Sequence, residues 1–334
     1  MRILTGLLIL FCLLPAPAYS SLHEVREVHY QMGTFLEITL WQSEDEQAKQ
    51  LIRQAVGKVH RLEEILSNFD PESAVSRFNQ RAGNGKIILP PELYDLLKIA
   101  LEFSTKTAGY FDVTVGPLVQ LWKESLSIGL LPSREALAKT RRLVGHEKLK
   151  LDDSGAAELL APEMKIDLGG IGKGYAVDRV ADLLKAAGVI SGLINFGGSS
   201  IYAIGSPPGQ QGWEIGLQGT DGKLRGLTYL RDMALSTSGS MGHSWMVGGK
   251  RYGHLINPKN GMPMTQVRMA TAITPTATAA EALTKPLVIL GRSAALSMTK
   301  ELPQTEAVVI PEHGPMFFSS EFRSKSLWRE VPAS

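Results

Sequence analysis

Apolar and polar residues follow two different periods along the chain, and each period predicts a different kind of element. Residues 27–41 alternate apolar and polar positions and are rich in β-branched and aromatic residues, which predicts two strands joined at Met32 and Gly33. Residues 43–66 instead place apolar side chains three and four positions apart, which predicts an amphipathic helix. The same spacing predicts three more helices, over residues 90–109, 132–143 and 174–187.

Short strand-like segments separated by glycine turns fill much of the second half of the chain. They are residues 192–205, 213–218, 227–239 and 249–258. Residues 149–168 are expected to form two further strands joined by a turn at Asp152–Gly155, whereas the polar residues 66–80 are expected to form a loop. Because helices and strands do not alternate as in repeated βαβ units, the pattern predicts an α+β fold with a mixed or antiparallel sheet.

Residues 1–20 have the pattern of a secretory signal peptide. A short apolar run over residues 3–14 is followed by small residues at Ala18 and Ser20, and cleavage is expected after Ser20. The run is too short to cross a bilayer as a helix, and no later segment has about 18 to 20 uninterrupted apolar residues. We therefore expect residues 21–334 to form a single domain that is periplasmic or secreted.

The composition excludes several classes of function. The formal charge is +2, from 35 basic and 33 acidic residues spread along the chain, so no basic stripe indicates a nucleic-acid partner. Cys12 is the only cysteine and lies in the expected signal peptide, so the mature protein is expected to lack thiol chemistry and disulfides. His60 is an isolated histidine within a predicted helix and is expected to be a surface or packing residue.

The segment KIDLGGIGKGYAVDRV, residues 165–180, has four glycines between an expected strand and an expected helix. A helix N-terminus after such a turn can bind an anion. A Walker A loop would need glycine in place of Asp167 and a hydroxyl residue in place of Gly174, so that interpretation fails. The dinucleotide fingerprint of Rossmann folds also fails on its spacing, and a plain structural turn remains the alternative for this segment taken alone.

Taken together, the ordered segments KIDLGGIGKGYAVDRV, INFGG, STSG, RYGHLINPKNG and AEALTKPLVILG resemble the FAD:protein FMN transferases, the ApbE-like family. The segments QMGT, SNFDPESAVSRFN and AGYFDVTVGPLVQLW resemble the N-terminal part of the same family, and the match runs from about Val28 to Gly291. The resemblance implies an ApbE-like fold, with mixed or antiparallel sheets flanked by helices. It also implies that the protein splits FAD with Mg²⁺, transfers FMN to a Thr or Ser hydroxyl of an acceptor protein, and releases AMP.

The resemblance further implies roles for individual residues. The flavin contacts are Met32, Phe69, Tyr110, Phe111 and Asp112, and Phe69 stands where the family often has tyrosine. Further cofactor-binding positions are Asp167, Lys173 and Leu255, and the metal positions are Gly170, Glu281, Thr284 and Lys285. His254 is the candidate catalytic base. The alternative is that His254 has only a structural role, as a histidine at the end of a strand that bonds to the backbone. Many family members act outside the cytoplasm, which agrees with a signal peptide and allows an acceptor associated with the inner membrane.

The sequence departs from the family at the metal positions. The family usually has Asp and, four residues later, Thr, whereas this chain has Glu281 and Lys285, with Thr284 just before. An ammonium group cannot ligate Mg²⁺. Ser199 and Asn257 also stand where acidic residues are common, so the expected site has lost negative charge.

Two outcomes follow if residues 276–285 are helical, because Glu281 and Lys285 would then face one another. In the first, Glu281, Thr284 and the Gly170 carbonyl hold Mg²⁺ while Lys285 turns away or contacts phosphate, and transfer continues. In the second, the Lys285 ammonium takes the place of the ion, pairs with Glu281 and neutralises the FAD pyrophosphate. The second outcome leaves open a non-catalytic flavin-nucleotide-binding or FMN-delivery protein.

Overall fold

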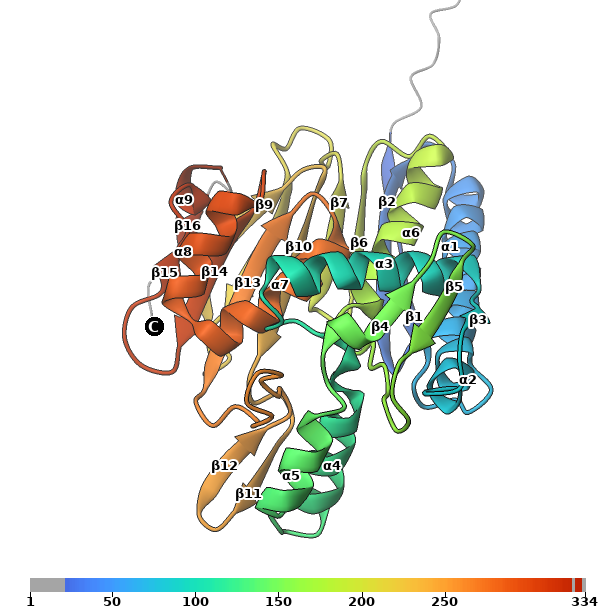
Figure 1. Cartoon of the computed structure of the whole chain (residues 1–334). Coiled ribbons are helices and arrows are strands. Elements are labelled where there is room, and N and C mark those ends of the chain that lie inside the picture. The colour runs from blue at the N-terminus through green and yellow to red at the C-terminus, as the bar shows by residue number, and fades with distance from the viewer. Residues whose placement is uncertain (1–21, 326–327, 332–334) are drawn as a thin grey trace, which may run out of the picture.

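The computed structural model of the chain describes residues 22–325 and 328–331 (Figure 1). The expected signal peptide and its cleavage point therefore lie outside the described residues. Across the described ranges, no helix is both long enough and apolar enough to cross a membrane.

An eight-stranded sheet lies at the centre of the fold, and its neighbouring strands are antiparallel. In spatial order its strands are β1 (His23–Gln31), β2 (Thr34–Gln42), β6 (Gly192–Phe196), β7 (Ser200–Ile204), β10 (Met233–Gly239), β13 (Arg268–Thr274), β14 (Glu306–Pro311) and β15 (Phe317–Phe318). Met32 and Gly33 have φ values of 45° and 75°, which suit a two-residue hairpin turn. The predicted hairpin is thus confirmed, and of the two sheet types left open the structure has the antiparallel one.

Helices α1 (Asp45–Leu66), α6 (Gly172–Ala186) and α7 (Ala277–Leu290) pack on one face of this sheet (Figure 1). Their apolar faces meet the sheet in the largest hydrophobic core of the described residues. With α3 (Pro91–Lys106) and α5 (Arg134–Arg141), they confirm the predicted helices. Further helical segments are α2 (Ala74–Gln80), η1 (Val113–Val115), α4 (Gly116–Ser127), η2 (His146–Lys148), α8 (Arg292–Glu301) and α9 (Phe322–Lys325).

Smaller sheets cover other surfaces of the fold. Their strands are β8 (Trp213–Gln218), β9 (Leu224–Leu230) and β16 (Arg329–Glu330), then β3 (Ile87–Ile88), β5 (Ala156–Leu159) and β4 (Leu149–Leu151), and the hairpin β11 (Ser244–Val247) and β12 (Lys250–Gly253). Alternate residues of β7 point to opposite faces of the central sheet. Tyr202 joins the core under the helices, whereas Ile201 packs with Trp213 of β8, so the central strands are buried on both faces.

The loop predicted over residues 66–80 is wrong in part, because it contains the helix α2. Ser73 begins this helix by accepting a hydrogen bond from the Ser76 N–H at 3.0 Å. Val75 and Phe78 are buried. The helix has only two turns, which is too short for a periodic apolar pattern to stand out in the sequence.

The two strands expected over residues 149–168 are confirmed as β4 and β5, which pair on either side of the turn at Asp152–Gly155. The second strand is shorter than expected, since it ends at Leu159 and residues 165–168, just before the glycine turn, belong to no strand. The Asn79 side chain takes the place of a strand partner. It accepts from the Ile166 N–H at 2.6 Å and donates to the Ile166 carbonyl at 3.0 Å. The Asp167 N–H donates to the Val113 carbonyl at 2.7 Å, which fixes the entry into the glycine turn.

Helices α4 and α5 and the β11–β12 hairpin form a lobe below the central sheet in Figure 1. Its small core has the Trp122 ring stacked on Tyr252, with the ring centroids 6.0 Å apart. Trp122 Nε1 also donates to the Gly261 carbonyl at 2.6 Å. Since Tyr252 and Ile256 both belong to this core, the segment between them, which carries His254, is held at both ends.

Candidate functional site

Two adjoining cavities of about 460 and 970 Å³ open where the N-terminus of α6 faces the lower lobe. Asp167, Gly169, Lys173 and His254 line both cavities, so we describe the two together as the cleft. The cleft brings together segments that are far apart in the sequence, from the β1–β2 turn to α7.

Most of the residues that the sequence nominated line this cleft. The smaller cavity is lined by Tyr110, Phe111, Asp112, Asp167, Gly170, Lys173, His254, Leu255, Glu281 and Lys285. Met32 and Phe69 line the larger cavity. Thr284 lines neither, because its side chain is fully buried behind the cavity wall.

The glycine turn lets α6 and α7 meet closely at their N-termini. A Cβ atom at Gly174 would lie 2.3 Å from the Ala277 carbonyl oxygen, so only glycine fits there. The Gly174 N–H donates to Glu281 Oε2 at 2.5 Å. In return, the buried Asp178 carboxylate accepts from the Ala277 and Thr278 N–H groups at 2.6 and 2.8 Å and satisfies the start of α7. This junction fixes Glu281 beside the glycine turn.

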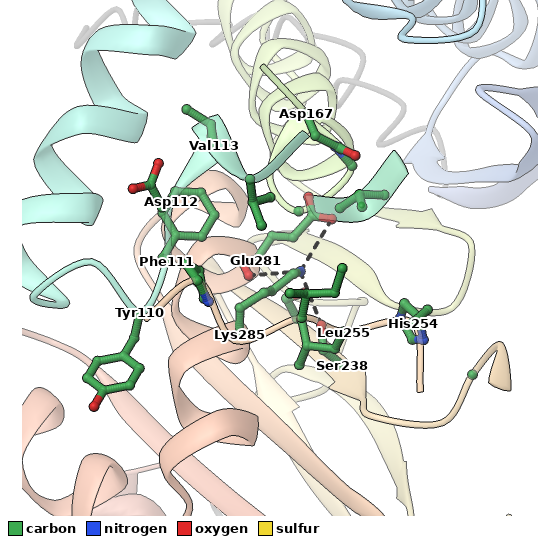
Figure 2. Close-up of a pocket in the computed structure, with 18 of the residues that line it drawn as sticks. Tyr110, Phe111, Asp112, Val113, Asp167, Ser238, His254, Leu255, Glu281 and Lys285 are labelled. Carbon is green, nitrogen blue, oxygen red and sulfur yellow. Dashed lines mark hydrogen bonds and ion pairs between the residues drawn. The ribbon is translucent and has the colours of Figure 1, made fainter. Parts of the chain in front are cut away.

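Lys285 lies at the floor of the smaller cavity, and oxygen atoms surround its ammonium group (Figure 2). Its Nζ donates to the Glu281 carbonyl at 3.1 Å, to Ser238 Oγ at 3.2 Å and to Thr284 Oγ1 at 3.3 Å. Glu281 Oε1 is 3.8 Å away and completes an ion pair whose carboxylate is nearly buried. The prediction that Glu281 and Lys285 face one another is therefore confirmed.

Burial lowers the pKa of Lys285 to about 8, against the attraction of Glu281, and the nearby Lys173 lowers it further. The group is still mainly protonated at neutral pH. Lys173 itself donates to Ser199 Oγ at 2.9 Å, so two ammonium groups border the same cavity. Ser199 thus lies in the cleft, whereas Asn257 accepts from the Lys259 N–H at 2.9 Å in the loop beyond it.

The donor set at Lys285 does not fit Mg²⁺ as the structure stands. Mg²⁺ requires oxygen ligands at about 2.0 to 2.1 Å in near-octahedral geometry. Here the hydroxyl and carbonyl oxygens near Glu281 point at an ammonium nitrogen instead. Among the described residues there is also no group of three His, Cys, Asp or Glu side chains that could hold a metal ion.

Asp167 lies at the entrance of the glycine turn, where both cavities meet. Its Oδ1 accepts from the Gly169 N–H at 2.8 Å. Burial raises the pKa of Asp167, while the hydrogen bonds from the Gly169 N–H and the Asn68 side chain oppose that rise. The carboxylate therefore orders the turn that leads into α6.

His254 projects into the cleft from the loop after β12 (Figure 2). Its Nδ1 lies 3.3 Å from the His243 carbonyl oxygen and 3.4 Å from the His243 nitrogen, and the two rings meet edge to face. The pKa of His254 is lowered, mainly by burial and then by the positive charges of His243 and Lys285. Nδ1 thus makes the backbone contact of the structural alternative, while Nε2 has no hydrogen-bond partner within the described ranges, so the role of His254 as a base remains a prediction.

The larger cavity begins at the β1–β2 turn and the loop after α1. The Met32 N–H donates to Glu63 Oε2 at 3.0 Å, which ties the turn to α1. Phe69 is 90% exposed, and its ring centroid is 5.9 Å from Lys123 Nζ. An exposed aromatic face of this kind can stack on a planar ring system such as a flavin. The flavin contact of Phe69 itself remains a prediction.

Asp112 is buried and uses its carboxylate to hold the chain around η1. Oδ1 accepts from the Thr114 N–H at 2.8 Å and from Thr114 Oγ1 at 2.6 Å, and Oδ2 accepts from the His146 N–H at 2.8 Å. The neighbouring Tyr110 side chain points away from Lys285 in Figure 2. The direct flavin contacts expected of Tyr110 and Asp112 remain predictions, and Asp112 has a clear structural role.

Several polar residues of the cleft were not predicted from the sequence, among them Ser238, Asn68 and His243. Ser238 contacts Lys285, Asn68 lines the larger cavity beside Asp167, and the His243 backbone contacts Nδ1 of His254. Ser238 belongs to the STSG segment and Asn68 to the SNFDPESAVSRFN segment. Ser238 and Asn68 thus lie in segments that carry the family resemblance, and His243 does not. Only the fold shows which hydroxyl or amide group of each segment reaches the site.

Comparisons with known proteins agree with this architecture. The ApbE family matches residues 32–309. The FAD:protein FMN transferase of Treponema pallidum is 31% identical over 266 residues, covering 74% of this chain and 73% of that protein. The enzyme of the same name from Escherichia coli K12 is 28% identical over 327 residues, covering 93% and 92%.

Solved structures show the same fold. The flavinyl transferase ApbE of Pseudomonas stutzeri, in its apo form, has a TM-score of 0.81 at 25% identity and covers 92% of this chain and 98% of its own. The flavin transferase ApbE of Vibrio cholerae has a TM-score of 0.79 at 26% identity and covers 90% and 99%. The fold and the cleft thus define an α+β protein of the flavin transferase type. The chain belongs to the ApbE family.

Proposed function

We propose that this protein is an FAD:protein FMN transferase, which moves FMN from FAD to a Thr or Ser hydroxyl of an acceptor protein and releases AMP. The observation that carries the proposal is the match to the ApbE family over residues 32–309, together with a cleft bordered by Lys173, His254 and Lys285. Relatives named for this activity align with most of the chain. These relatives do not favour the rival interpretation, a non-catalytic flavin binder, because both are named as transferases.

The groups of the cleft suit the chemistry of this transfer. The ammonium groups of Lys173 and Lys285 neutralise the pyrophosphate of FAD, and the exposed ring of Phe69 stacks on the flavin. His254, neutral near pH 7, accepts the proton of the acceptor hydroxyl at Nε2. The hydroxyl oxygen then bonds to the phosphorus of the FMN half, the bond from that phosphorus to the bridging oxygen breaks, and AMP leaves with the electron pair.

The assay incubates the purified protein with FAD and a Thr-bearing acceptor peptide and measures covalent flavin fluorescence and free AMP. We expect both products, and we expect His254→Ala to lower their rate about 100-fold or more. His60→Ala is the matched control, because the His60 side chain is 66% exposed on α1 and lies outside the cleft. FAD binding without product, with or without divalent cations, would favour the non-catalytic binder.

We also propose that the protein acts outside the cytoplasm, on an acceptor in the periplasm or at the inner membrane. The signal peptide pattern of residues 1–20 supports this location.

A further inference from the structure

The oxygens around Lys285 form a connected hydrogen-bond set whose members hold the ammonium group. The Thr284 hydroxyl donates to the Glu281 carbonyl at 2.7 Å and therefore accepts from Ser238 Oγ, 2.8 Å away. Glu281 Oε2 is used by the Gly174 N–H. The three N–H donors of the ammonium group are met by the Glu281 carbonyl, Ser238 Oγ and Thr284 Oγ1, while Glu281 Oε1 lies 3.8 Å away.

The glycine turn makes room for the lysine side chain. A Cβ atom placed on Gly170 would lie 3.3 Å from Lys285 Cε and 3.6 Å from the Phe111 ring. A larger residue at Gly170 would therefore crowd the lysine stem. Because only 15% of the Lys285 side chain is exposed, the stem is confined between α7 and the turn. An ammonium group that left this place would give up its hydrogen bonds and leave Glu281 without its counter-charge.

The position of the ammonium group suits an anionic ligand in the cleft. Lys285 and Lys173 border the same cavity, together with the glycine turn at the start of α6. Of the acidic side chains there, Glu281 is paired with Lys285, Asp112 is engaged at η1, and Asp167 holds the turn. A diphosphate placed between the two lysines would meet positive charge without needing a bridging ion.

We propose that in this chain the Lys285 ammonium stands in for the divalent cation, so that the protein binds the pyrophosphate of FAD, and cleaves it, without a metal ion. The cleavage part rests on the proposed transferase function, whereas the binding part does not. The charge that collects on the pyrophosphate oxygens as AMP leaves is then neutralised by Lys285 and Lys173.

Two variants at position 285 distinguish a site that depends on the lysine ammonium from a site that binds a metal ion. Lys285→Met keeps the length of the side chain but removes its charge and offers no oxygen ligand. Lys285→Thr restores the hydroxyl that the family usually has at this position. Lys98→Thr, on the exposed face of α3, is the surface control. Circular dichroism spectra of each variant are needed to check that it is folded before its affinity is compared.

The first measurement is FAD affinity from flavin fluorescence, in EDTA and in Mg²⁺. The unmodified protein is expected to bind FAD equally well in both, and Lys285→Met is expected to lose about 10- to 100-fold affinity in both. Lys285→Thr should lose affinity in EDTA and regain part of it in Mg²⁺. An affinity that Lys285→Met leaves unchanged would overturn the proposal.

The second measurement is Mn²⁺ binding to the protein–FAD complex by electron paramagnetic resonance, with transfer assayed in parallel. The unmodified protein should bind no Mn²⁺ tightly and should form product in EDTA. Product that requires Mg²⁺, together with one tightly bound Mn²⁺, would overturn this proposal but support the transferase function. Metal-independent FAD binding that depends on Lys285, with no product in any condition, would overturn the transferase function and the cleavage step while supporting the role of Lys285 in binding.

Discussion

At the scale of single residues, the charge state of His254 sets the pH dependence expected for transfer. Burial and the positive charges of His243 and Lys285 lower the pKa of His254 below its usual 6.5. A general base must be unprotonated, so activity is present above this pKa and is lost as pH falls through it. We expect the acid limb of a kcat/KM profile to lie below pH 6.5.

The same argument predicts a shift in Lys285→Met, because removing a positive charge beside His254 raises its pKa. The acid limb of the variant should move to higher pH, even though its overall activity is lower. A limb that keeps its position in Lys285→Met would mean that another group controls the profile.

The contacts around Lys285 could be predicted from the sequence only in part. The helical spacing of Glu281 and Lys285 was sufficient to predict that they face each other, and they form an ion pair with atoms 3.8 Å apart. The same spacing could not show that Thr284 points into the protein and donates to the Glu281 carbonyl. It also could not show that Ser238, from β10, approaches Lys285, because that contact depends on how α7 packs across the sheet.

At the scale of elements, the close contact of α6 and α7 should be sensitive to one methyl group. Gly174→Ala would place its Cβ 2.3 Å from the Ala277 carbonyl, so the helices must separate and the hydrogen bond to Glu281 weakens. We expect the free energy of unfolding in urea to fall by about 2 to 3 kcal/mol. FAD affinity should fall as well, since Glu281 and Lys285 move with α7.

Gly57→Ala is the matched control, because Gly57 lies within α1 and a Cβ there would approach the Arg61 side chain only to 3.9 Å. Replacing a helical glycine by alanine at a roomy position should raise the free energy of unfolding by about 0.5 to 1 kcal/mol. Equal effects of the two substitutions would show that helix propensity, not the α6–α7 contact, governs position 174.

Element by element, the sequence predicted the long helices well because their apolar faces repeat over several turns, as in α1 and α3. It failed at residues 165–168, whose extended appearance suggested a strand. Their backbone groups are instead satisfied by the Asn79 side chain and the Val113 carbonyl. A side chain 87 positions away that substitutes for a strand partner leaves no periodic signal in the local sequence.

At the scale of the whole molecule, the α+β class followed from the mixture of helical and alternating patterns, but the order of the strands did not. β2 pairs with β6, and β7 with β10, across long stretches of intervening chain. The cleft depends on this order, because the strands place α6, α7 and the lower lobe around it. Family resemblance supplied the candidate site residues where local pattern could not.

The single cysteine makes processing of the whole chain directly measurable. Cys12 lies within residues 1–20, so cleavage after Ser20 would leave an exported protein without any thiol. We expect the exported protein to begin at Ser21 and, when denatured, to take up no maleimide label.

Ala18→Arg should block cleavage, because a large charged residue replaces a small one near the cut, and this variant should take up one label per chain. An exported unmodified chain that still takes up one label would show that the segment is retained as an anchor, and the acceptor would then have to reach a transferase held at the membrane surface.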